Sequence, residues 1–479
     1  MEPMKKVDLN RSFIYHNRHV LGFFALGFLL YYFIVFGFAQ VPGGLSQPEI
    51  DSAVLSGNFA LPASIVDLPY HALQWLSINI FGLSIFSIRV PSVILALLTG
   101  GFTIAAIRNL FHSNAAIITG LLAASSVIFL DIARTGAPMI MSIFLFVLAL
   151  FAVSQYMAQK KPRALWLILM VLALVAGAYS PLGIYILVCG FLVAIFHPRV
   201  RASILRYRIG NTILAGLVGL VMLAPMAAAI VLQPSVGLTI LGLDNLNISL
   251  ESIGQNLAAI VLPWTSSGLG LVVPLLDFVS IAIAIVGILT LIRDRHAARS
   301  YLTLGLLAAA IVFTIINPSW AYTLFMPLIF LTATGINTLI STWYNLFPVN
   351  PLARVFGLVP LTLLVLGLVI SGHARYVDSN LYNADTVYAH NYVFRAVCTA
   401  VNERSAHRIN LVVPEAERPF YGLLEREYDG LTVTTDAQKK NVDTWIFIPE
   451  TFDQKTGTPT RVITGWTRDD NVLVKIYEK

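Results

Sequence analysis

The sequence predicts a helical protein that crosses a membrane many times and ends in a small α/β domain. Hydrophobic residues make up 57% of the 479 residues, and charged residues make up only 12%. Soluble domains are about 45–50% apolar and about 25% charged. The apolar surplus lies in repeated blocks that are long enough to span a bilayer, and the chain after residue 371 is polar.

Eleven apolar blocks are each expected to form a membrane-spanning helix. They are residues 20–40, 88–107, 115–132, 137–157, 164–179, 181–197, 210–232, 271–292, 300–316, 320–341 and 355–371. The stretch from 164 to 197 is divided because Pro181, in the segment AYSPLG, removes a backbone donor and clashes with the turn before it. The first block is long and has no small-residue cleavage site after it, so it is expected to remain as a span.

The distribution of basic residues predicts that the N-terminus lies in the cytoplasm. Of the 31 lysine and arginine residues, 16 then fall on inner segments, two on outer loops and 13 after residue 371. An excess of positive charge on the inner side is the usual pattern of membrane proteins. This orientation places the loops 41–87 and 233–270 on the outer face. We therefore expect a transmembrane domain over residues 1–371 and an extracytoplasmic domain over residues 372–479.

The tail alternates between strand and helix patterns. The runs RINLVVPE, LTVTTD, DTWIFIPE and NVLVKIYEK are typical of strands, and RPFYGLLEREY is typical of a helix between the first two. A strand–helix–strand order predicts a small α/β domain with some parallel pairing. The sequence contains no glycine-rich nucleotide loop, CxxC or HExxH, so no cofactor and no metal site are expected.

The segment GGLSQPEIDSA, residues 43–53, carries two carboxylates at the start of the first external loop. Ser46 and Glu49 form the pattern of a capping box, and Pro48 fits the first helical turn, so a helix is expected to begin here. We expect its apolar face to lie against the membrane surface. Glu49 and Asp51 are about 200° apart around a helix, so they cannot form a tight acid pair. Capping explains Glu49 without a catalytic role, and a solvated flank explains Asp51.

Two arginines lie at the outer ends of spans. A second short helix is expected over residues 69–81, and Arg89 follows it at the start of the second span. Arg134, in LDIARTGAPM, stands three residues after Asp131, so the two can form a surface ion pair worth under about 1 kcal/mol. The alternative is that each guanidinium binds a lipid phosphate at the bilayer edge, because its planar fork matches the phosphate oxygens.

The order of several motifs resembles the GT-C membrane glycosyltransferases of the protein O-mannosyltransferase and aminoarabinose-transferase type. The similar segments are PGGLSQPE, LPYHALQWLSINIFGLSIFSIRVPS and ARTGAP within residues 20–157, and more loosely NPSWAYTLFMPLIFLTATGI within residues 310–341. The resemblance implies a GT-C-like fold and the transfer of a sugar from a polyprenyl phosphate, with inversion and without a metal or cofactor. In that family a carboxylate of the first loop takes the proton of the acceptor hydroxyl, and basic groups stabilise the leaving phosphate.

The catalytic residues of that family carry over only in part. The family's catalytic aspartate falls on Pro48, and the glutamate that follows it falls on Glu49. The lysine that often precedes the family's PPL segment falls near Asp67, which reverses the charge. Either Glu49 or Asp51 has taken over as the base, or the chain keeps the fold with altered or lost chemistry.

Candidates for substrate binding come from the same resemblance. Arg89 and Arg134 match family arginines and are candidates for binding the phosphate. The remaining candidates carry aromatic or imidazole side chains close to the predicted membrane surface: Tyr70, His71, Trp320 and Tyr322. His71 could orient an acceptor, and the aromatic residues could line a lipid groove. The alternative for all four is an ordinary position in the interfacial aromatic belt.

The leading hypothesis is an enzyme of the cell membrane that uses a lipid-linked sugar and a glycan, lipid or protein acceptor. One alternative is a non-catalytic GT-C relative that binds a glycan or a partner through its tail. The other is a transporter of lipid-linked glycans, although charges within the spans are nearly absent, whereas transporters place ionisable groups at the midplane. Nucleic acid is not an expected partner, because the basic residues lie in short loops between spans.

Overall fold

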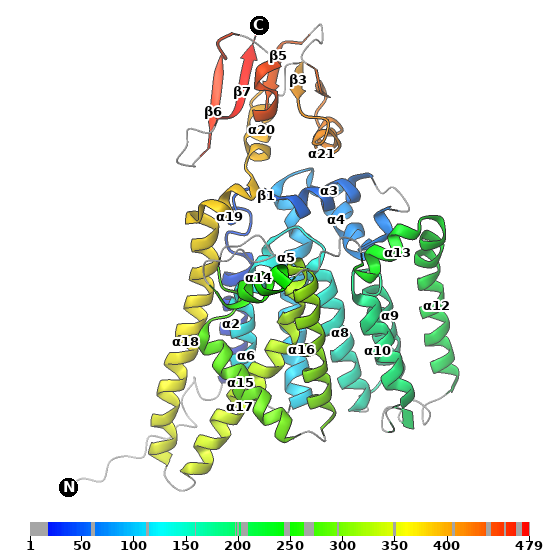
Figure 1. Ribbon diagram of the computed structural model, residues 1–479, viewed down its shortest axis with the longest axis vertical. Coiled ribbons are helices and arrows are strands. Elements are labelled where there is room, and N and C mark those ends of the chain that lie inside the picture. The colour runs from blue at the N-terminus through cyan, green and yellow to red at the C-terminus, as the bar shows by residue number, and fades with distance from the viewer. Residues whose placement is uncertain are drawn as a thin grey trace, which may run out of the picture.

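The computed structural model shows a bundle of helices with a small sheet at one end (Figure 1). The described residues are 18–58, 63–111, 115–158, 160–196, 198, 201–202, 209–243, 250–262, 273–294, 297–347, 351–404, 408–436, 442–454, 457–465 and 472–478. Most of the basic N-terminal segment and parts of both predicted external loops lie outside these ranges. Two short helices, α3 (Gln47–Asn58) and α4 (Leu68–Phe81), lie between the bundle and the sheet.

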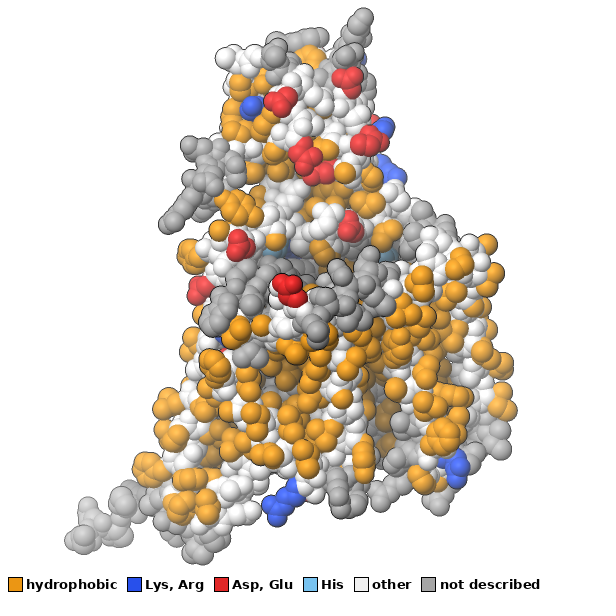
Figure 2. All heavy atoms as spheres, in the orientation of Figure 1, with side chains coloured by type: hydrophobic (Ala, Val, Ile, Leu, Met, Phe, Trp, Pro, Cys, Tyr) orange, Lys and Arg blue, Asp and Glu red, His pale blue; other side chains and the backbone are white. Residues whose placement is uncertain are grey.

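Apolar helices of unequal length build the bundle. In chain order they are α2 (Arg18–Leu30), η2 (Tyr31–Val35), α5 (Ile85–Phe111), α6 (Ala116–Ser125), α7 (Val127–Arg134), α8 (Met139–Met157), α9 (Arg163–Gly177), α10 (Gly183–Phe196), α12 (Ile209–Leu232), α13 (Pro234–Leu241), α14 (Leu250–Val261), α15 (Phe278–Arg293), α16 (Ala298–Ile316), η4 (Pro318–Leu324), α17 (Phe325–Leu346) and α18 (Pro351–Tyr382). Hydrophobic side chains cover the sides of the bundle in Figure 2.

The described helices support a multi-pass membrane protein. Six are long and apolar enough to cross a bilayer, and the bent pair α6 and α7 would make a seventh. Shorter apolar helices, among them α9 and α15, accompany them. The number of eleven spans therefore stays a prediction.

The third expected span, residues 115–132, is broken. Helices α6 and α7 meet at a bend of 63°, and the residue between them, Ser126, is extended with φ −68° and ψ 142°. The carbonyl of Ser125 faces α18 at Gly372, where a Cβ would lie only 2.4 Å from that oxygen, so the two backbones approach closely. The bend buries α7 throughout, and with it Asp131 and Arg134.

The predicted turn at Pro181 is confirmed. Helix α9 ends at Gly177 and α10 begins at Gly183. Leu182 adopts a left-handed backbone with φ 65°, and its amide donates to the carbonyl of Ile240 at 3.0 Å. The turn is thus tied to the end of α13.

Both helices expected in the first external loop are present, but the first one packs differently. Strand β1 (Leu45–Ser46) leads into α3, then η3 (Ala63–Ile65) leads into α4, which ends at Gly82. The apolar face of α3, with Ala53 fully buried, packs against the C-terminal part of the chain instead of the membrane surface. Gly57 lies so close to Leu423 that a Cβ there would stand 2.5 Å from its Cδ2.

The chain after α18 forms a five-stranded sheet with the order β4-β3-β5-β7-β6. Its elements are α19 (Ala384–Tyr388), β2 (His390–Asn391), α20 (Val393–Asn402), β3 (Ile409–Val412), α21 (Arg418–Glu425), β4 (Leu431–Thr434), β5 (Thr444–Phe447), η5 (Pro449–Gln454), β6 (Arg461–Thr464) and β7 (Val472–Glu478). Strand β3 pairs in parallel with β4 and β5, whereas β7 pairs antiparallel with β5 and β6.

The C-terminal part is joined to the first loop by backbone and side-chain contacts. Helix α18 continues past the predicted boundary at residue 371, as far as Tyr382. Strand β1 then pairs antiparallel with β2. The carboxylate of Glu427 accepts a hydrogen bond from the amide of Leu83, and Arg426 donates to the carbonyl of Gly57 at 3.0 Å. The C-terminal part therefore holds the loop that carries Glu49.

Candidate active site

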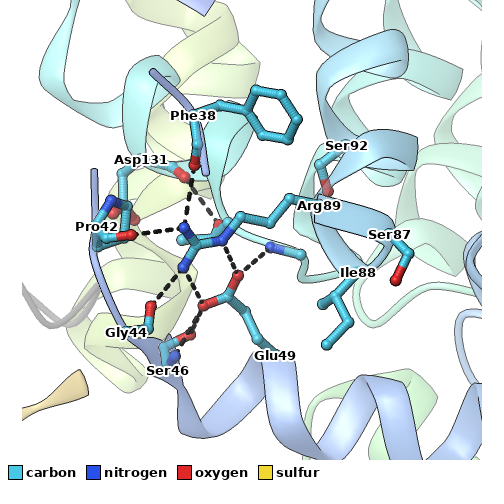
Figure 3. Close-up of polar contacts among 12 residues, drawn as sticks. Phe38, Pro42, Gly44, Ser46, Glu49, Ser87, Ile88, Arg89, Ser92 and Asp131 are labelled. Carbon is cyan, nitrogen blue, oxygen red and sulfur yellow. Dashed lines mark hydrogen bonds and ion pairs between the residues drawn. The ribbon is translucent and has the colours of Figure 1, made fainter. Parts of the chain in front are cut away.

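An ion pair between Glu49 and Arg89 lies where the first loop meets the bundle (Figure 3). Glu49 stands in the first turn of α3, and Arg89 stands near the start of α5. The distance from Nε of Arg89 to Oε1 of Glu49 is 2.7 Å, and both side chains are fully buried. The structure thus brings together two of the residues that the sequence singled out, although 40 positions separate them.

Every N–H group of the Arg89 side chain already has an acceptor. Nε and one Nη2 hydrogen reach Glu49, the other Nη2 hydrogen reaches the carbonyl of Gly44, and Nη1 donates to the carbonyls of Phe38 and Pro42. A guanidinium has five N–H donors, and five acceptors are present here. Arg89 as it stands therefore has no donor left for a lipid phosphate, and its contacts favour a structural role.

The carboxylate of Glu49 is equally occupied. Besides Arg89, it accepts hydrogen bonds from the amide of Ser46 at 2.8 Å, the hydroxyl of Ser46 at 3.2 Å and the amide of Gly136 at 2.7 Å. The contact from the Ser46 amide is one half of the predicted capping box. The other half differs, because the Ser46 hydroxyl donates to the Glu49 carboxylate and is not seen to accept from the Glu49 amide. Burial alone would raise the pKa of Glu49, but the charge of Arg89 and the hydrogen bonds from Arg89, Gly136 and Ser46 hold the pKa below its ordinary value. Glu49 is thus a fixed anion, and a base that must accept a substrate proton needs an open lone pair.

The second acidic candidate lies apart from both arginines. Asp51 is exposed, and its Oδ1 accepts a hydrogen bond from Nε2 of Gln47 at 2.8 Å. This contact joins successive turns of α3. Asp51 therefore occupies the solvated flank that the alternative interpretation expected, and its catalytic role stays a prediction.

Arg134 is buried, and only part of its guanidinium donates hydrogen bonds. Its Nε and Nη2 donate to the carbonyl of Phe33 at 3.0 and 2.7 Å, and Nη2 also donates to the carbonyl of Phe36 at 3.0 Å. Its guanidinium carbon lies 5.5 Å from the ring centre of Tyr376. Nη1 takes part in none of these hydrogen bonds. The predicted surface ion pair with Asp131 is wrong, because both residues are buried and Arg134 turns to backbone carbonyls instead.

The four aromatic and imidazole candidates lie in the interior and not in an interfacial belt. Tyr70, His71, Trp320 and Tyr322 are all buried. The hydroxyl of Tyr70 is 2.7 Å from Oγ of Ser92 on α5. Trp320 and Tyr322 belong to the hydrophobic core through η4. Their burial arises from the packing of η4 against α16 and α17, which local hydropathy does not report.

Sequence reasoning missed the carboxyl group of Asp67, which the structure buries just before α4. Asp67 occupies the N-cap position of α4, but its side chain makes no capping hydrogen bond and its φ is +54°. Burial raises the pKa of Asp67 to about 7, and a favourable interaction with Ser180 only partly opposes this. In the sequence, an aspartate before Leu-Pro looks like an ordinary helix N-cap. The one signal that pointed to Asp67 was its negative charge near the position where the family has a lysine.

Among the residues that the structure describes, no group of three or more His, Cys, Asp or Glu side chains could hold a metal ion.

Comparison with known proteins shows what the chain as a whole is similar to. The family described as dolichyl-phosphate-mannose-protein mannosyltransferase matches residues 69–228. The crystal structure of ArnT from Cupriavidus metallidurans in the apo state is similar over 96% of this chain and 98% of that one, with 14% identity and a TM-score of 0.53. The structure of ArnT from the same organism bound to undecaprenyl phosphate gives the same coverage, with 13% identity and a TM-score of 0.55. No curated protein sequence matches the chain.

The chain therefore has the GT-C glycosyltransferase fold that its motifs resemble. The family match together with this fold indicates a glycosyltransferase.

Proposed function

We propose that this protein transfers a sugar from a polyprenyl-phosphate carrier to an acceptor on the outer face of the cell membrane, with inversion and without a metal ion. The fold carries the proposal, because 96% of the chain aligns with a protein solved with undecaprenyl phosphate bound. The proposed orientation has the N-terminus in the cytoplasm and the C-terminal sheet outside. The proposed domain division remains 1–371 and 372–479, with α18 bridging the two.

Arg134 is the favoured ligand of the lipid phosphate. It is held by α7 inside the bundle, and Nη1 remains available for an anion. A groove between α6, α15, α17 and α18 offers a path for the apolar lipid chain, since it is lined by Ile128, Leu275, Leu328 and Leu368. Arg375 and Asp277 line the same groove and bind each other at 3.1 Å. Arg134 does not line this groove, so the proposal gives the lipid two separate contacts, the anionic head at Arg134 and the apolar tail in the groove.

In the proposed reaction the acceptor oxygen attacks the anomeric carbon from the face opposite the phosphate. The bond between that carbon and the phosphate oxygen breaks, and the phosphate leaves with the electron pair. Arg134 stabilises the charge that develops on the phosphate. The acceptor proton passes to a carboxylate. Glu49 and Arg89 act in this proposal by fixing the first loop on the bundle.

A non-catalytic GT-C relative is the second candidate function. Two observations favour it: Pro48 stands in place of the family aspartate, and Glu49 has no lone pair to spare. The same membrane protein would then bind a glycan or a partner and perform no transfer.

The test is a transfer assay with purified protein in liposomes and radiolabelled polyprenyl-phosphate sugars. We expect the wild type to transfer label to an acceptor, and Arg134→Gln to raise the KM for the donor by about 10-fold or more, as loss of a charge-assisted contact worth about 1.5–3 kcal/mol requires. Arg418→Gln, an exposed arginine of the C-terminal part, is the matched control and should leave KM unchanged. Absence of transfer across several donors and acceptors would support the non-catalytic relative, and movement of intact lipid-linked sugar across the liposome would support a transporter.

A further inference from the structure

Four buried polar atoms without a hydrogen-bond partner lie together around the start of α4. They are Oγ of Ser64, Oδ1 of Asp67, Nδ1 of His71 and Oγ of Ser180, each unpartnered among the described residues. Ser64 and Ser180 are connected to this place because His71 bonds to the backbone of Ser64 and because Ser180 interacts with the carboxyl of Asp67. Buried polar groups are normally paired, and the single hydroxyl hydrogen of Ser180 can serve only one lone pair of the Asp67 carboxylate, so the cluster keeps hydrogen-bonding capacity for a ligand.

Backbone strain is found at the same place. The structure describes only two residues other than glycine with a left-handed backbone, Asp67 at φ 54° and Leu182 at φ 65°. The amide of Asp67 donates to the carbonyl of Tyr179 at 2.9 Å, so the two strained residues stand on segments that touch. Such conformations are strained for residues other than glycine and gather at functional sites, where the surrounding structure holds them in place.

Among the residues that the structure describes, no cation acts on the carboxyl of Asp67. Tyr70 of its own helix and Tyr322 of η4 are the titratable groups on which its charge acts. His71 follows it four positions later in α4. Burial lowers the pKa of His71, although hydrogen bonds to the backbone of Ser64 and Val66 partly oppose this, so the imidazole is neutral near pH 7. Because no described cation lowers its pKa, the carboxyl of Asp67 ionises near neutral pH. A general base is most effective when its pKa lies near the working pH.

Asp67 is also close to the anchored site. The charges of Glu49, Arg89 and Asp67 all act on the hydroxyl of Tyr70. Tyr70 is thus within reach of the charges of both the ion pair and Asp67. Both belong to the end of the bundle that faces the C-terminal sheet (Figure 1).

We propose that Asp67 is the base of the transfer reaction, and that Ser64, His71 and Ser180 bind hydroxyl groups of the sugar or the acceptor beside it. This inference rests on the proposed function. The acceptor oxygen forms its bond to the anomeric carbon while the carbon–phosphate oxygen bond breaks. The phosphate takes that electron pair, and the acceptor proton moves to an oxygen of Asp67, which later releases it to water. Atoms and electrons balance without any further reactant.

The experiment compares wild type with Asp67→Asn and Asp67→Glu in the liposome transfer assay over pH 5 to 9. Asparagine tolerates a left-handed backbone, so Asp67→Asn keeps the shape of the turn. We expect Asp67→Asn to lower kcat by about 100-fold or more with the KM for the donor within about threefold, since a positioned base contributes about 10²–10⁴-fold. The wild-type kcat should rise with pH and level off above about pH 7, and the residual activity of Asp67→Asn should not show this rise. Asp67→Glu should keep part of the activity, and the midpoint of its kcat–pH profile should be displaced from that of the wild type.

The matched control is Asp385→Asn, which changes an exposed aspartate in the first turn of α19 and should leave kcat unaltered. If wild type transfers sugar and Asp67→Asn does so equally well, the base assignment is overturned while the proposed function survives, and the cluster holds water only. If wild type transfers nothing, the proposed function fails and the base with it. Should Asp67→Asn not fold, a wild-type profile that is flat between pH 6 and 8 would overturn the assignment.

Discussion

Two acidic residues of the first external loop are buried, and their surroundings are opposite. Glu49 accepts five hydrogen bonds and faces a guanidinium whose five donors are all used. Asp67 has a left-handed backbone, only Ser180 as a polar side-chain partner and, among the described residues, no cation acting on it. The first arrangement is complete without a ligand, and the second is not.

The difference shows that burial of a carboxylate does not identify a catalytic acid or base. The number of lone pairs and N–H groups left over separates a structural acid from a reactive one, because a saturated carboxylate cannot accept a substrate proton without first losing a partner. By this criterion the family-like position, Glu49, belongs to the scaffold, and Asp67 is the reactive candidate.

The largest expected effect comes from breaking the ion pair. Arg89→Met or Glu49→Leu alone should lower the free energy of unfolding by about 3–5 kcal/mol, because each leaves a buried charge without its partner. The double variant should recover part of the loss, although the carbonyls of Phe38, Pro42 and Gly44 would still lose their donor. The measurement is the free energy of unfolding in detergent for the two single variants and the double variant. Single variants as stable as wild type would show that the Glu49–Arg89 pair does not hold the first loop on the bundle.

The second effect separates the two acids by pH. The pKa of Asp67 in the folded protein is raised to about 7, so its contribution to stability is fully present below the ordinary pKa of an aspartate and is lost as pH rises toward 7. Asp67 should therefore contribute a fall in stability of about 2–3 kcal/mol between pH 5 and pH 8, at about 1.4 kcal/mol per pH unit below the pKa. Asp67→Asn should make the measured slope shallower by this contribution. An unchanged slope in the variant would mean that another group causes it.

Gly136 provides a third and smaller test. A Cβ at this position would lie 2.8 Å from the carbonyl oxygen of Ile88, and its amide donates to Glu49. Gly136→Ala should force the two segments apart, weaken that hydrogen bond and cost about 1–3 kcal/mol in unfolding free energy. Gly101→Ala, at a helical glycine with open space around its Cβ position, is the control and should not destabilise the protein. Equal stability of both variants would contradict the close packing at Glu49.

The smallest expected effect is at Asp51. Asp51→Asn removes one exposed charge and alters one contact with Gln47, so the free energy of unfolding should change by less than about 0.5 kcal/mol. A larger change would mean that Asp51 takes part in contacts beyond α3.

Local features of this protein were readable from residue order. The contact from the Ser46 amide to Glu49 and the turn at Pro181 depend on neighbours within a few positions. Apolar block length likewise predicted the multi-pass helical class. The motif order over the first spans pointed to the GT-C fold, since it reflects the sequence of loops and helices along the chain.

The roles of individual side chains depended on long-range packing. Glu49 binds Arg89, 40 positions away in the sequence, and Gly136, 87 positions away. The amide of Asp67 donates to the carbonyl of Tyr179, in the segment between α9 and α10. Hydrogen-bond saturation, burial and backbone strain arise only when such distant segments come together. Residue order therefore specified which helices and turns form, whereas the assembled bundle determined which acid is neutralised and which remains open to chemistry.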